Sequence, residues 1–209
     1  HLRRGEFTAA ERFLRASIAR QIRRNPNPSD GEAFYQLGRC LLLQAWAGGS
    51  ELARNNTRPV ASKLAPTRST HPTEQLLAEA NEAFGKAAWN QAWQSASWHA
   101  QAEIECTQQR WPEALDLLDR ALRLNVDHLR ARNLRALVLR QLGRDNEATA
   151  QLSANLALDP LDSWTQHLLG RPITGDTQIR LDVALDYRRA GFHREALAIL
   201  QDAQPEPHS

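Results

Sequence analysis

The side chains that most often perform chemistry are scattered along this chain and form no known constellation. Cys40 and Cys106 fall in different predicted helices without metal-ligand spacing, and we interpret them as buried thiols in a reducing compartment. Glu103 and Glu105 lie two positions apart and face different sides of a helix, which makes them a poor acid–base pair. The histidines show no His-x-x-x-His or His–Cys spacing, so no metal site is predicted; besides His1, they lie at His71, His99, His128, His167, His193 and His208.

Phosphate chemistry and nucleophilic catalysis also lack a sequence signal. Gly48-Gly49 is not followed by Lys-Ser/Thr, and the loop from Gly170 to Gly175 does not follow a strand. No serine or cysteine stands in a nucleophile context. The sequence therefore predicts no catalytic residue, no cofactor and no catalysis by this chain alone.

Tryptophan is the one residue type whose grouping suggests a binding role. Trp89, Trp93 and Trp98 are predicted to cluster across a helix–turn–helix, with Trp111 nearby in the chain. They can fill wide gaps between helices, or project as stacking platforms for sugar rings or anchors for a docking domain. Trp98 falls on a packing position, so Trp89 and Trp93 are the candidates for stacking or docking.

Composition indicates an ordinary globular protein and excludes several classes of partner. The 209 residues are 42% hydrophobic and 24% charged, and the net charge is +2. So small a net charge predicts no nucleic-acid or membrane partner, and no apolar run reaches 18 residues. The chain contains no methionine, so we expect a piece of a longer polypeptide, and residues 1–5 do not resemble a signal peptide. A cytoplasmic location is a separate expectation.

The elements that must position these residues repeat along the chain. Three triplets share the spacing i, i+4, i+7, which is one face of a helix, and their first members lie 34 residues apart. They are Ala80, Phe84 and Ala87; Ala114, Leu118 and Ala121; and Ala148, Leu152 and Asn155. A 34-residue period with helix–turn–helix units resembles the tetratricopeptide (TPR) repeat.

We therefore predict an all-α, right-handed α-solenoid of four to five TPR-like helical hairpins in a single domain, 1–209. A capping box at Thr8 is expected to begin the first helix, and Gly48-Gly49 to end the second near Trp46. The further predictions are an insertion loop at 47–72, helices at 74–89, 91–108, 112–125, 127–143 and 146–158, an inter-repeat insertion at 161–176 with a short helix Ser163–Leu169, helices at 177–189 and 194–204, and a disordered tail at 205–209.

Three stretches resemble a more particular family. They are 25–38 (NPNPSDGEAFYQLG), 86–93 (KAAWNQAW) and 181–191 (LDVALDYRRAG). They are similar to the C-terminal half of large bacterial proteins in which a galactose-mutarotase-like β-sandwich of unassigned function precedes TPRs. The resemblance implies the helical module of a carbohydrate-related protein, without the sandwich where catalytic carboxylates would lie. The 47–72 insertion departs from the family pattern.

The concave surface of a TPR array is lined by the first helix of each pair. The predicted groove-binding residues are Tyr35, Arg39, His99, Glu103, Asn133, Arg140 and Arg188, with Glu32, Arg130, Gln141 and Arg189 on the same face. This face is more basic toward the C-terminal end, which suits an acidic peptide or an acidic face of a partner domain, although a solvated polar face explains it equally well. The lysines of chaperone-tail-binding TPRs are absent.

Three functions remain open. The first is a non-catalytic interaction module that packs on a β-sandwich of the same polypeptide or mediates oligomerisation; an apolar surface near residues 1–24 would favour it. The second is a free-standing adaptor that binds peptides on the concave face. The third is the helical part of a sugar-active enzyme, to whose carbohydrate site the tryptophans and the 47–72 loop contribute.

Overall fold

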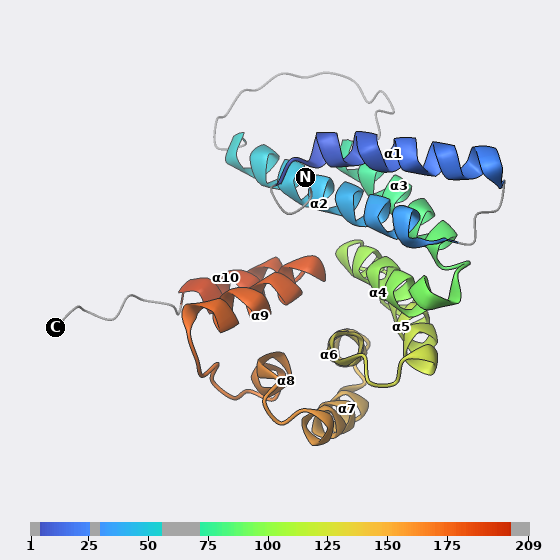
Figure 1. Ribbon diagram of the computed structural model, residues 1–209. Coiled ribbons are helices and arrows are strands. Elements are labelled where there is room, and N and C mark those ends of the chain that lie inside the picture. The colour runs from blue at the N-terminus through green and yellow to red at the C-terminus, as the bar shows by residue number, and fades with distance from the viewer. Residues whose placement is uncertain (1–4, 26–29, 56–71, 202–209) are drawn as a thin grey trace. The chain divides into compact units, whose positions relative to one another are not determined.

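The computed structural model describes residues 5–25, 30–55 and 72–201, with backbone alone for 48–55. Every regular element in these residues is an α-helix (Figure 1). The helices are α1 Phe7–Arg24, α2 Glu32–Asn55, α3 Pro72–Ala87, α4 Gln91–Thr107, α5 Trp111–Leu124, α6 Leu129–Gln141, α7 Asp145–Leu158, α8 Ser163–Leu168, α9 Thr177–Arg189 and α10 His193–Gln201.

The helices form two compact units, His1–Ser97 and Trp98–Ser209, whose boundary falls inside α4. The three predicted triplets lie on α3, α5 and α7, and all nine side chains are fully buried. The stripe of small and large residues is therefore the packing face of each second helix, as its spacing predicts. The single domain predicted over 1–209 stays a prediction.

In the first unit, α2 packs on α3 and on α1. Gly38 allows the close crossing of α2 and α3, because a Cβ atom at this position would lie 2.7 Å from the Phe84 ring. Only a residue without a side chain fits there.

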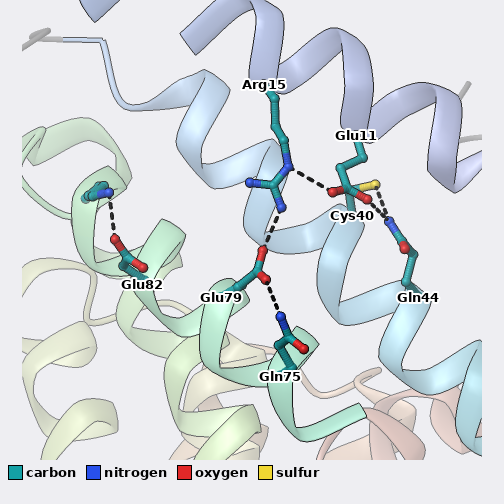
Figure 2. Close-up of polar contacts among 8 residues, drawn as sticks. Glu11, Arg15, Cys40, Gln44, Gln75, Glu79 and Glu82 are labelled. Carbon is teal, nitrogen blue, oxygen red and sulfur yellow. Dashed lines mark hydrogen bonds and ion pairs between the residues drawn. The ribbon is translucent and has the colours of Figure 1, made fainter. Parts of the chain in front are cut away.

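Polar side chains also join the three helices of the first unit (Figure 2). The Arg15 guanidinium on α1 donates to Glu11 at 2.8 Å and to Glu79 on α3 at 2.6 Å. Gln44 on α2 donates to the second oxygen of Glu11 at 2.8 Å, and the Cys40 thiol donates to the Phe7 carbonyl at 3.3 Å. Hydrogen bonding by Gln44, together with Arg15, lowers the pKa of Glu11. A single carboxylate on α1 is thus held from both sides.

The second unit is built around α6. A helix at a protein surface usually buries one stripe of its side chains, whereas α6 is buried on almost all sides. Its buried residues are Ala131, Asn133, Leu134, Ala136, Leu137, Val138 and Leu139. One continuous hydrophobic core joins the apolar ones among them to side chains from every other helix of the unit.

The last helical pair of this unit contacts its first pair. The Trp111 ring at the start of α5 lies 5.7 Å from the Phe192 ring in the turn between α9 and α10. In the same turn, Gly191 has a φ of +79°, and a Cβ atom there would lie 2.9 Å from the Thr107 Cα. Glycine is required on both grounds, and the unit closes on itself through this contact.

The structure differs from the sequence predictions at several helix ends. The predicted end near Trp46 is wrong, because α2 continues through Gly48-Gly49 to Asn55. Each glycine disfavours a helix by about 1 kcal/mol, too little to end one that good helix formers continue. Helix α1 begins at Phe7 without a side-chain cap, so Thr8 does not cap it. The short helix predicted at Ser163–Leu169 is α8. Residues 56–71 of the predicted 47–72 insertion lie outside the described residues. The predicted tail 205–209 lies outside them as well.

Candidate binding surfaces

In the first unit, the candidate binding residues Tyr35 and Trp93 pack against other rings, whereas Trp89 and Arg39 are exposed. The Tyr35 ring stacks on Trp93 with 4.8 Å between centroids and lies 5.6 Å from the Phe84 ring. Trp93 is partly buried there, so one face of its indole is occupied by Tyr35. Trp89 is 72% exposed in the turn after α3, and Arg39 is exposed on α2. Of the two stacking candidates, Trp89 therefore has the more open ring.

Helix α1 has a second surface, within residues 1–24, where an apolar surface would favour an interaction module; the arginines beside it were not predicted. Ala10 and Ile18 are buried, but Phe13 is 55% and Ile22 is 44% exposed, on opposite flanks of the buried stripe. The outer side is rich in arginine, since the helix carries five arginines and one glutamate. All five arginines are exposed; Arg15 pairs with Glu11 and Glu79, whereas no ion pair joins Arg12, Arg20, Arg23 or Arg24 to another described side chain. Helical projection of the sequence would have revealed this face.

In the second unit, charged side chains from three helices converge. The His99 ring on α4 lies 4.8 Å from the ring of His128, the residue that precedes α6. On α9, the Asp186 carboxylate lies 3.5 Å from Arg130 of α6 and 3.3 Å from Arg189 of its own helix. We call these five residues the inner cluster. His128 and Asp186 were not predicted to contribute, because helices far apart in the chain bring them together.

The protonation of the inner cluster reflects burial and neighbouring positive charge. Burial, together with the charges of His128, Arg130 and Arg189, lowers the pKa of His99 to about 3. Burial and then Arg130 lower the pKa of His128. Burial raises the pKa of Asp186, although both arginines act in the opposite direction. At neutral pH the two imidazoles are therefore uncharged.

Asn133 does not line a groove, and this part of the prediction needs correction. The side chain is fully buried, because α8 in the inserted segment packs over it. Its amide donates to Asp162 at 2.7 Å, and its oxygen accepts from Thr165 at 2.7 Å and from Asn155 at 2.8 Å. Its role is structural, within a network that joins α6, α7 and α8.

The remaining predicted groove residues lie around the inner cluster or on its helices. Glu103 is partly buried one turn beyond His99 on α4. Arg140 is partly buried near the C-terminal end of α6, where its charge acts on Tyr187, and Arg188 is exposed on α9. Their part in binding stays a prediction.

Both cysteines are buried and carry free thiols. Burial raises the pKa of each, which disfavours the reactive thiolate. Among the described residues, no three or more His, Cys, Asp or Glu side chains are arranged to share a metal ion. The same residues include no helix with the length and apolar character needed to cross a bilayer.

Comparison with known proteins supports the fold. The chain is similar to MamA, a TPR-like helical protein, in its crystal structure, with a TM-score of 0.51 and 16% sequence identity over 97% of this chain and 89% of that one. No protein-family model and no curated protein matches the sequence. The predicted all-α solenoid of TPR-like hairpins is confirmed.

Proposed function

We propose that this chain is a non-catalytic protein-interaction module, the C-terminal part of a larger carbohydrate-related protein. Its helices pack on a β-sandwich domain of the same polypeptide or mediate its oligomerisation. The TPR-like fold supports this function, because such folds build extended surfaces from stacked helical pairs. The carbohydrate context comes from the sequence resemblance alone.

The surface of α1 is the observation that carries the proposal. Phe13 and Ile22 are exposed on either side of the helix, and its arginines other than Arg15 lack carboxylate partners among the described residues. Apolar side chains beside guanidinium groups are typical of protein interfaces, where arginine and aromatic residues are enriched. An apolar surface near the start of the chain is also what distinguishes this function from a free-standing adaptor.

Site-specific photocrosslinking in the native polypeptide tests the proposal. A photoreactive phenylalanine at Phe13 should give defined crosslinks to one peptide, either in another domain of the polypeptide or in a second copy. The same residue at Ala157, which is exposed on α7, is the control and should give none. Crosslinks that are equally weak and dispersed at both positions would contradict the assignment of α1 as the interface.

A free-standing peptide-binding adaptor is the second candidate, and the inner cluster favours it. The cluster presents two arginines to one carboxylate, on the basic face predicted from the sequence. Binding of a peptide to the separate second unit, without crosslinks from α1, would make the adaptor the better account.

The helical part of a sugar-active enzyme is the third candidate, and the exposure of Trp89 favours it. An indole with an open face can stack on a sugar ring. Oligosaccharide should then quench tryptophan fluorescence in the native chain and fail to do so after Trp89→Ala. Quenching that persists in this variant would exclude Trp89 as the platform.

A further inference from the structure

The inner cluster has an arrangement that packing alone does not require. Its side chains come from α4, from the start of α6 and from α9. The hydrophobic core of the unit is complete without them. Charged and titratable groups brought together by separate helices are candidates for binding a ligand.

The charge of the cluster is unbalanced. Arg130 and Arg189 both contact Asp186, so two guanidinium groups share one carboxylate while the imidazoles are neutral. The more distant Asp162 and Asp182 accept hydrogen bonds of their own, from Asn133 and Gln178. One positive charge is therefore left without a matching anion in the immediate contact set.

The amino end of α6 adds to this field. No side chain in the described part of the chain caps α6, and its first turn contains no acidic residue. The unpaired N–H groups and the helix dipole at such an end favour an anion. The cluster is also open to a ligand, since the Arg130 side chain is 55% exposed and both histidines keep partial access to solvent.

We propose that the inner cluster binds one carboxylate group presented by a partner protein, held between Arg130, Arg189 and the amino end of α6. This inference rests on the proposed protein-interaction function and names a chemical group that the interaction recognises. A carboxylate is favoured over a phosphate because a single negative charge balances the excess. Guanidinium forks also match carboxylate geometry, as they do for Asp186.

Histidine NMR on the full chain tests the proposal. The imidazole signals of His99 and His128 are followed at constant ionic strength during titration with a capped hexaglutamate peptide. A capped hexaglutamine peptide, sodium phosphate and sodium chloride serve as the other probes. Of these four probes, only hexaglutamate should shift both imidazole signals. It should also raise the pKa of both histidines, because a bound anion stabilises their charged forms. The groups facing this pair are Arg130, Arg189 and Asp186, with Glu103 one turn along α4.

Two substitutions in the inner cluster should change the affinity for hexaglutamate in opposite directions. Arg130→Gln should weaken hexaglutamate binding by about tenfold, the usual loss for one charge-assisted hydrogen bond. Asp186→Asn should tighten binding, because it removes the carboxylate that competes for both arginines. Arg120→Gln on α5 is the matched control, since Arg120 is a similarly exposed arginine that pairs with Asp116, and it should leave binding unchanged.

Several results would overturn the proposal. Equal shifts with sodium chloride would show screening rather than a site, and shifts with phosphate alone would assign a different ligand. Weakening by Asp186→Asn would show that this carboxylate supports binding rather than competes with it. None of these results bears on the crosslinks from Phe13, so failure of the carboxylate site and failure of the α1 interface are distinguishable.

Discussion

The repeat pattern and the structure predict different effects for the substitution Asn155→Ala. At the equivalent positions of the two preceding triplets the chain has Ala87 and Ala121, so the pattern alone expects alanine to be tolerated. In the structure the Asn155 amide donates to Asn133 at 2.8 Å and its oxygen accepts from Arg132 at 2.7 Å. The structure therefore predicts a destabilised protein.

The size of the effect follows from the bonds that are lost. The bond to the Arg132 guanidinium is charge-assisted and contributes about 1.5–3 kcal/mol, and the bond to Asn133 contributes about 1 kcal/mol. Asn133 keeps its bond from Thr165, and Gln151, which also donates to Asn155, can turn to solvent. We expect Asn155→Ala to lower the free energy of unfolding by about 2–4 kcal/mol, which corresponds to roughly 5–15 °C in Tm.

Urea unfolding followed by far-UV and near-UV circular dichroism measures this change. Asn146→Ala is the control, since it makes the same chemical change at an exposed position of α7 and should stay within about 0.5 kcal/mol of the parent. A double-mutant cycle with Asn133→Ala should show a coupling of at least about 1 kcal/mol. An Asn155→Ala protein as stable as the parent would refute the reasoning and show that the network adds no net stability.

Three other predictions concern the closing contact, the inner cluster and the first unit. In thermal unfolding, Gly191→Ala should lower the stability by about 1–3 kcal/mol more than Gly143→Ala does, because both glycines have positive φ but only Gly191 faces backbone, at Thr107. Equal losses of stability would show that the turn at Gly191 can shift to accommodate a Cβ atom. As pH falls from about 6.5 toward 3, His99 stays neutral in the folded chain, whereas in the unfolded chain it binds a proton, so the free energy of unfolding should fall by up to about 1.4 kcal/mol per pH unit. His99→Gln should make this pH dependence less steep, as measured by urea midpoints. An unchanged slope in the variant would assign the proton to another group. Arg15→Gln should destabilise by less than about 1 kcal/mol at low salt and by almost nothing in 1 M sodium chloride, measured by Tm, and a loss that persists in salt would mean that packing rather than charge is involved.

The helical fold could be predicted from the sequence because its packing residues recur locally. Ala114, Leu118 and Ala121 are buried by the same face of α5 that their spacing predicts. Helix ends were less predictable, as the passage of α2 through Gly48-Gly49 shows. Local propensities of about 1 kcal/mol are easily outweighed by the residues that follow.

The candidate site could be predicted only in part. The repeat position of His99 predicts it on the concave surface, but its neighbours His128 and Asp186 depend on how separate helices meet. Asn133 was wrongly placed in a groove because standard repeat positions assume that the surface over α6 stays open. The extra helix α8 covers that surface, and no periodicity in the sequence reports where an inserted helix will pack.

The contact between Trp111 and Phe192 has a consequence for how this protein can evolve. Open repeat arrays gain or lose a unit easily, since each unit touches only its neighbours. In the second unit the last helical pair also meets the first, at Gly191 and Thr107. Inserting or deleting one hairpin between them would break this contact, so its number of hairpins is fixed by the geometry of closure. Sequence divergence should therefore proceed there by substitution and by loop insertion, rather than by modular expansion.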